Sequence, residues 1–103
     1  MSHDRIASAL ALLQKFPGNE LARYHLAQAY FDAGDHARAA EHLRPLCANK
    51  PDWMVVHILL GKCLLALGET AEGQRALEHA RDLAVAQHHD GPREELEELL
   101  KTL

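Results

Sequence analysis

The sequence predicts an all-α protein built from repeated antiparallel helix pairs. One indication is an internal period, because residues 20–53 shifted by 34 positions align with residues 54–87. A second is that apolar residues at helical spacing flank a glycine in both copies, which is typical of two helices joined by a tight turn. Composition agrees, since 48% hydrophobic and 25% charged residues with four prolines and six glycines indicate one soluble, ordered domain.

The residues that coincide under this shift occupy apolar, small and turn positions. They are Leu26 with Leu60, Ala27 with Gly61, Tyr30 with Leu64, Gly34 with Gly68, Asp35 with Glu69, Ala39 with Gly73, Leu43 with Leu77, Leu46 with Ala80 and Pro17 with Pro51. The pattern resembles the tetratricopeptide repeat over residues 20–87. The resemblance implies a right-handed superhelix of helical hairpins, about six helices in all, that holds proteins or peptides and is not an enzyme.

An N-terminal capping helix is expected over residues 4–17. Four apolar residues recur there at helical spacing: Ile6, Ala9, Leu10 and Leu13. The segment runs into Pro17, as the second helix of the first repeat runs into Pro51. Because roughly three repeats are usually needed to stabilise such a stack, flanking helices have to close the ends of two.

The first repeat spans residues 20–53. Asn19 is expected to cap a helix that runs to residue 33, and Gly34 ends that helix. Asp35 then caps a second helix that runs to residue 48. Each helix of the pair therefore has a start and a stop signal.

Pro45 departs from the repeat pattern because it falls inside the second helix. It removes the hydrogen bond that its N–H would give to the carbonyl of Glu41. We therefore expect either a kink or a loosened last turn.

The second repeat spans residues 54–87. Its first helix is expected to begin at Asp52, and its second to restart after a turn at Gly68 and Glu69, near Thr70. Small residues recur where the two helices of each pair cross: Ala27, Ala39, Gly61 and Gly73. These positions predict close approach of the helices, so Gly61→Leu should overpack the contact.

A C-terminal capping helix is expected over residues 92–103, with Pro92 at its first position. Its apolar residues reproduce the spacing of the second repeat with an offset of 39: Leu96, Leu99, Leu100 and Leu103. Five extra residues around 88–92 therefore lengthen the preceding helix or loop. Several glutamates give this helix an acidic outer face.

The family resemblance implies a concave groove lined by the first helix of each repeat. The residues at the corresponding positions are Leu21, Tyr24, Gln28 and Phe31 in the first repeat and Val55, Ile58, Lys62 and Leu65 in the second. Trp53 is expected at the groove rim, either as a binding anchor or in packing between repeats. The expected contact surface for a protein or peptide is mostly apolar.

Two outcomes are open for the helix from Trp53 to Leu67, which is apolar almost all round. Such a helix is normally buried on every side. Either the C-terminal helix covers Ile58 and Leu65, or a contiguous patch stays exposed and marks a binding or self-association surface.

Charge and sequence pattern limit the possible partners and location. The net charge of −4 argues against nucleic acid, whose binding needs a clustered basic face. No apolar stretch is long enough for a membrane span, and the N-terminus lacks a signal-peptide core, so a cytoplasmic location is expected. Cys47 and Cys63 fall at packing positions and are expected to be reduced thiols.

No cofactor, metal or catalytic site is predicted. The eight histidines include no pair four residues apart and are expected to face solvent. Acidic residues are spread over outer faces, and no glycine-rich phosphate loop occurs.

Three functional hypotheses follow. The first is a tetratricopeptide-type adaptor or chaperone-like scaffold that anchors a peptide or helix of a partner protein in the groove. The second is a module that forms a homodimer through the same apolar surface. The third is a regulatory subunit that carries a metal or small ligand, for which His88 and His89 would be the residues to test.

Overall fold

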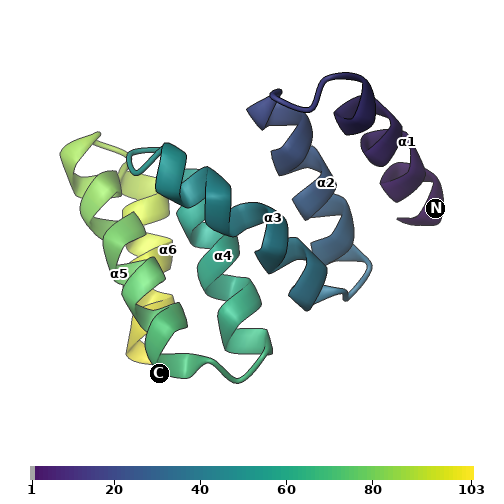
Figure 1. Cartoon of the computed structure of the whole chain (residues 1–103). Helices are drawn as coiled ribbons and strands as arrows, with labels where there is room; N and C mark the ends of the chain where they lie inside the picture. Colours follow the sequence, from purple (N-terminus) through teal and green to yellow (C-terminus); the bar gives the residue numbers. More distant parts are fainter. Residues whose placement is uncertain (1) are drawn as a thin grey trace.

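The computed structural model describes residues 2–103, and within that range the chain forms six α-helices and no strand (Figure 1). They are α1 (Ser2–Lys15), α2 (Glu20–Asp32), α3 (His36–Asn49), α4 (Met54–Ala66), α5 (Thr70–Ala86) and α6 (Asp90–Lys101). The predicted all-α helical-repeat fold is confirmed.

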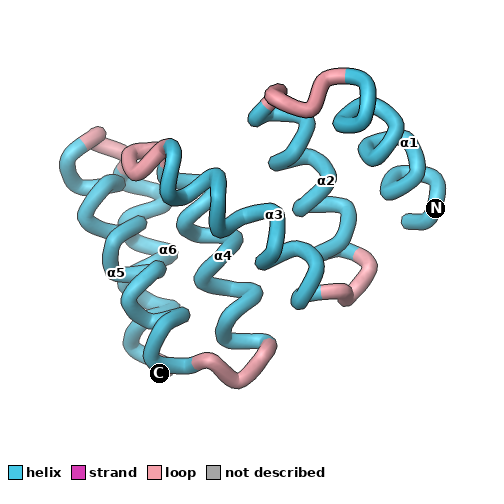
Figure 2. The backbone as a smooth tube through the Cα atoms, viewed as in Figure 1, coloured by secondary structure: helices cyan, strands magenta, loops and turns pink. Residues whose placement is uncertain are grey.

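The helices form a stack in which each packs against the next along the chain, and α2 also touches α4. Short loops alternate between the two ends of the helices, so that consecutive helices run antiparallel (Figure 2). The stack measures 38 × 26 × 22 Å and runs from α1 to α6, with the termini at opposite ends (Figure 1). The first helices of the two pairs, α2 and α4, are therefore neighbours.

The predicted caps and turns of the first pair are confirmed. The Asn19 side chain accepts a hydrogen bond from the backbone N–H of Ala22 at 3.0 Å, and Asp35 accepts one from the N–H of Arg38 at 3.2 Å. Gly34 and Gly68 have φ of +83° and +81°, a left-handed conformation that a side chain disfavours. These two glycines therefore fix the turns between α2 and α3 and between α4 and α5.

Three predicted helix ends need correction. α1 ends at Lys15, which leaves Pro17 in the loop. α4 begins at Met54 and not at Asp52, because Trp53 occupies the N-cap position, without a side-chain capping bond. α6 begins at Asp90 and places Pro92 third, where the missing N–H costs nothing because the first four N–H groups of a helix lack partners within it.

Pro45 lies inside α3, which continues for four residues beyond it to Asn49. The helix ends on an i to i−4 hydrogen bond of 2.8 Å from the N–H of Lys50 to the carbonyl of Leu46. The predicted loosening of the last turn is therefore absent at this end.

Replacing the exposed Pro45 by alanine is expected to stabilise the protein by about 1 to 2 kcal/mol. Alanine restores an N–H to the Glu41 carbonyl and removes the ring, although it also frees the unfolded chain. Urea unfolding followed by circular dichroism measures the change, with Ala48→Gly, at another exposed α3 position, as a destabilising control. A less stable Pro45→Ala variant would contradict this account.

Three apolar clusters fill the stack. The central cluster joins α2, α3 and α4 and consists of Ala27, Ala39, Ala40, Leu43, Leu46, Val56, Leu60, Cys63 and Leu64. The N-terminal cluster joins α1 and α2 through Leu13, Ala22 and Leu26. The C-terminal cluster joins α5 and α6 through Leu77, Ala80 and Leu96. Each terminal helix thus contributes to a core of its own.

Both cysteines are free thiols, as predicted. Burial raises the pKa of Cys47 and of Cys63 to about 11, so both stay protonated at neutral pH. Among the described residues, no helix has the length and apolar character needed to cross a membrane.

Candidate functional site

All nine predicted contact residues keep some exposed surface on α2 or at α4. Leu21 is 55% exposed at the start of α2, and Val55 is 36% exposed at the start of α4. Lys62 is exposed farther along α4. Three more are half-buried: Tyr24, Gln28 and Trp53.

The other three predicted contact residues are also half-buried, and each packs against one of the apolar clusters. Phe31 packs against the central cluster, and its ring lies edge-on to that of His36 with 5.1 Å between centroids. Ile58 and Leu65 pack against the C-terminal cluster, to which α6 contributes Leu96. The C-terminal cluster, built from α5 and α6, therefore covers Ile58 and Leu65 only in part. Both stay half-buried, and their part in binding stays a prediction.

An aromatic contact connects α2 to the start of α4. The rings of Tyr24 and Trp53 lie 5.3 Å apart at an interplanar angle of 50°. Gln28 Nε2 donates a hydrogen bond of 3.2 Å to the Tyr24 hydroxyl, and burial raises the pKa of Tyr24. We call Leu21, Tyr24, Trp53 and Val55 the apolar strip.

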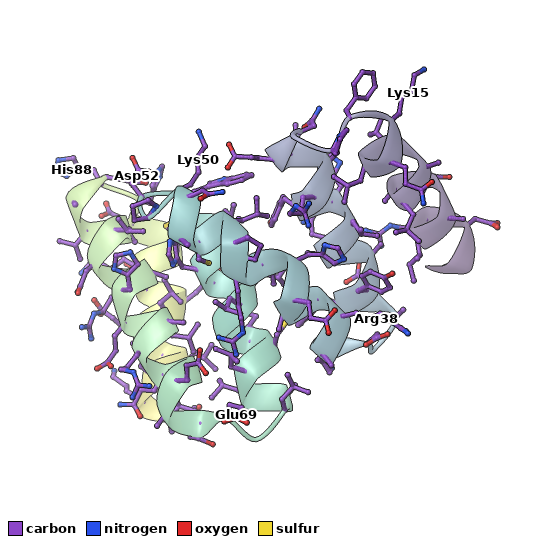
Figure 3. The ribbon with its side chains drawn as sticks, viewed as in Figure 1. Lys15, Arg38, Lys50, Asp52, Glu69 and His88 are labelled. Carbon is purple, nitrogen blue, oxygen red and sulfur yellow. The ribbon has the colours of Figure 1, made fainter. Side chains whose placement is uncertain are left out.

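A pocket of 440 Å³ opens at one end of the apolar strip, and we call it the rim pocket. It is lined by Glu20, Leu21, Lys50, Asp52 and Trp53. Lys50 Nζ lies 3.5 Å from a carboxylate oxygen of Glu20, whereas Asp52 has no ion-pair partner among the described residues. Lys50 and Asp52 project from the loop between α3 and α4 (Figure 3). The rim pocket thus combines an apolar wall with charged edges.

Three side chains fix the loop that carries Lys50, Asp52 and Trp53, and we call them the loop clamp. Each lies within hydrogen-bonding distance of one of three consecutive loop carbonyls. The pairs are His57 Nε2 with the Lys50 carbonyl at 3.3 Å, His79 Nε2 with the Pro51 carbonyl at 2.7 Å and Gln87 Nε2 with the Asp52 carbonyl at 3.0 Å. A carbonyl only accepts, so both imidazoles donate from Nε2. The loop is therefore tied to α4 and α5.

The prediction that the histidines face solvent is wrong for His57. Its side chain is only 7% exposed, and its ring lies edge-on to that of His79 with 4.5 Å between centroids. Burial lowers the pKa of His57, the proximity of His79 lowers it further, and the Lys50 carbonyl opposes the shift. The signal in the sequence was the apolar character of almost the whole helix, which favours burial of a histidine within it.

A hollow of 630 Å³ lies between α1 and α2. Its lining residues are Asp4, Arg5, Ser8, Ala9, Leu12, His25, Gln28 and Ala29. Among the described helices, α1 packs against α2 alone, and the hollow lies along this contact. Gln28 lines the hollow and also bonds to Tyr24, so it connects the hollow to the apolar strip.

The described side chains do not gather three His, Cys, Asp or Glu residues closely enough to hold a metal ion. What the site offers is apolar and aromatic surface with a hydrogen-bonding edge at Gln28 and charged groups at the rim. Such a surface can bind a protein segment by burying its apolar side chains.

Sequence reasoning missed three residues of the rim pocket, namely Glu20, Lys50 and Asp52. Asp52 was expected to cap α4 and instead presents its side chain at the pocket. Lys50 and Glu20 are 30 positions apart in the sequence, and the antiparallel packing of α2 on α3 brings the start of one helix beside the end of the other. The recurrence of Pro17 at Pro51 locates both loops but does not indicate that their flanking charges meet.

The chain belongs to the tetratricopeptide-repeat family, whose members are in general protein-binding scaffolds and not enzymes. A family model of this type, described as anaphase-promoting complex, cyclosome, subunit 3, matches residues 3–80. The resemblance inferred from the repeat positions is thereby confirmed.

Two relatives support this assignment. The chain is 38% identical over 86 residues to the TPR repeat-containing protein PA0015 of Pseudomonas aeruginosa, covering 84% of this chain and 80% of that protein. It also resembles the solution structure of protein BPP2914 from Bordetella parapertussis, with a TM-score of 0.81 and 26% identity over 94% of this chain and 84% of that one.

Proposed function

We propose that this protein is an adaptor that binds a peptide or helix of another protein on the apolar strip, and that it is not an enzyme. The observation that carries the proposal is the exposure of Leu21 and Val55 at the starts of α2 and α4, where the half-buried rings of Tyr24 and Trp53 lie against each other. Aromatic side chains that become buried on binding dominate many protein interfaces. Gln28 and Lys62 flank the strip and supply polar contacts that set the register of the partner.

The family supports this role in two ways. Its members are in general protein-binding scaffolds, and the matching family model is named after a subunit of a multi-protein complex. The first helices of the pairs, which the resemblance identifies as the lining of the groove, are also the helices that carry most of the strip.

Selection of a random phage-displayed peptide library on the immobilised protein tests the proposal. Selected peptides are expected to bind the wild type and to lose about tenfold or more in affinity to Val55→Gln, because the variant puts an amide where apolar surface is buried. Val85→Gln is the matched control, since Val85 is 53% exposed on α5, outside the strip.

Circular dichroism and thermal unfolding should show that both variants keep their helical structure. Peptides that bind both variants as they bind the wild type would contradict the assignment of the strip. A selection that enriches no peptide dependent on Val55 or Leu21 would contradict the proposed function itself.

The alternative, a homodimer that uses the same strip, is favoured by the apolar character of Leu21 and Val55. A dimer of this kind would be two-fold symmetric. End-to-end stacking of copies is less suitable, because it would need small residues at the outer faces of α1 and α6. Arg5 occupies the repeat position of the small residues Ala39 and Gly73, and Leu100 occupies the position of Gly61. Light scattering over a range of concentrations distinguishes the two functions. A constant monomer mass would mean that the strip is free to bind a partner. A dimer that Val55→Gln dissociates would mean that the strip is the dimer interface.

A further inference from the structure

The rim pocket is an open depression with one apolar wall. Its volume of 440 Å³ is enough to receive one large side chain of a partner. Leu21 and Trp53 supply the apolar wall, and Trp53 is itself held against Tyr24. An aliphatic or aromatic side chain of a partner would therefore be the part that enters.

The charges around the pocket do not cancel. Two carboxylates and one ammonium line it, which leaves one net negative charge. Because Lys50 lies 3.5 Å from Glu20, the uncompensated group is the carboxylate of Asp52, next in sequence to Trp53. A cation is attracted both by a carboxylate and by the face of a tryptophan ring, so the combination suits lysine or arginine.

Lys62, the cation on α4, does not reverse the preference of the rim pocket for a positively charged group. Lys62 lines the 70 Å³ cavity between α4 and α6 together with Glu95, and at 1.5 Å per residue it lies roughly 12 Å along α4 from the helix start, away from the rim pocket. The chain as a whole carries a net charge of −4, which attracts a basic partner and repels an acidic one during encounter. The local charge at the rim pocket and the overall charge of the chain therefore both favour a positively charged partner.

The loop clamp prepares the pocket before a partner arrives. The three loop carbonyls at residues 50–52 are already in contact with His57, His79 and Gln87. Binding then has little backbone to order, which leaves more of the contact energy for affinity.

We infer that the rim pocket binds a partner segment in which an apolar side chain is next to a lysine or arginine. The apolar side chain packs on Leu21 and Trp53, and the cationic side chain pairs with Asp52. This inference rests on the proposed function and specifies the chemistry of the partner at one end of the strip.

Three blocked peptides of the sequence Gly-Ser-Leu-X-Ser-Gly, with arginine, glutamine or glutamate at X, test the inference. Trp53 is the only tryptophan of the chain, so its indole N–H resonance reports binding at the pocket without ambiguity. In an NMR titration at low salt, the arginine peptide is expected to bind about threefold to tenfold more tightly than the glutamate peptide. The difference should shrink at high salt, because both groups are near the surface.

Asp52→Asn should remove most of the difference between the arginine and glutamate peptides while retaining binding of the glutamine peptide. The side chain of Asp52 makes no capping bond to α4, so the variant leaves that helix start unchanged. Asp82→Asn is the matched control, because Asp82 is an exposed acid of α5 outside the pocket, and the preference should survive in it.

Equal or tighter binding of the glutamate peptide would overturn the inference, as would an indole resonance that none of the peptides shifts at millimolar concentration. Those results would leave the proposed function standing if phage-selected peptides still depend on Val55. Loss of that dependence, in contrast, would reject the proposed function independently of the charge preference.

Discussion

Gly61→Leu is expected to lower the free energy of unfolding by about 3 kcal/mol or more, and Gly61→Ala by about 1 to 3 kcal/mol. A Cβ atom at residue 61 would lie 2.7 Å from both Cγ and Cδ2 of Leu77, and 3.2 Å from the carbonyl oxygen of Gly73. Leu77 is fully buried, so its side chain cannot swing into open space. α4 and α5 would have to separate along the contact that joins the second pair.

Thermal or urea unfolding followed by circular dichroism measures this effect, and each 1 kcal/mol should lower Tm by about 4 to 8 °C in a domain of this size. Gly18→Ala is the control, because Gly18 lies in the loop between α1 and α2, has no positive φ and has open space around an added Cβ. That variant should be as stable as the wild type or more stable by up to about 1 kcal/mol. Equal stability of Gly61→Ala and the wild type would contradict the close-approach account.

Features that depend on neighbouring residues could be predicted from the sequence. Gly34 and Gly68 indicate the turns because few other residues adopt their backbone conformation, and Asn19 and Asp35 indicate helix starts because their side chains bond to N–H groups three residues later. The 34-residue register also indicated that α4 and α5 approach closely at Gly61. These interactions lie within one helix or recur between the two copies.

Contacts between distant residues could not be predicted in the same way. The start of α4 depends on a loop whose carbonyls meet His79 and Gln87, 28 and 35 residues away from their partners. No counterpart of this arrangement exists in the first repeat, where Pro45 stands at the position of His79. The register therefore gave no indication of it.

For the same reason, only part of the candidate site could be predicted from the sequence. Leu21 and Val55 follow from the helical positions of the repeat, and both are exposed. Whether Ile58 and Leu65 are open depends on where α6 packs, and the insertion before α6 breaks the register that would locate it. Two of the three charges of the rim pocket, Lys50 and Asp52, belong to a loop, which the periodicity does not describe.

Acidification from about pH 7.5 to about pH 5.5 is expected to lower the free energy of unfolding, and His57→Gln is expected to lessen that loss. Burial, followed by the effect of His79, holds the pKa of His57 below its ordinary value, while the Lys50 carbonyl and Asp52 oppose the shift. The unfolded chain takes up its proton near pH 6.5, and the folded chain only at lower pH. Stability is therefore fully present above about pH 6.5 and is lost as the pH falls through the folded pKa.

His42 contributes in the same direction. Burial lowers its pKa, the charge of Arg23 lowers it further, and Glu41 opposes the shift. Arg23 Nη1 lies 2.9 Å from His42 Nδ1, and a guanidinium only donates, so protonation of Nδ1 would break this hydrogen bond. The double variant His42→Gln/His57→Gln should therefore show a flatter dependence than either single variant.

Urea midpoints measured across this pH range at constant ionic strength give the size of the effect, which for one fully linked proton is at most about 1.4 kcal/mol per pH unit. Asp35 and Glu72, whose pKa values are lowered from about 4, act only below this range and do not obscure it. His25→Gln, at an exposed histidine of α2, is the control and should follow the wild type. Parallel curves for the wild type and His57→Gln would mean that the buried imidazole is not the group whose protonation destabilises the fold.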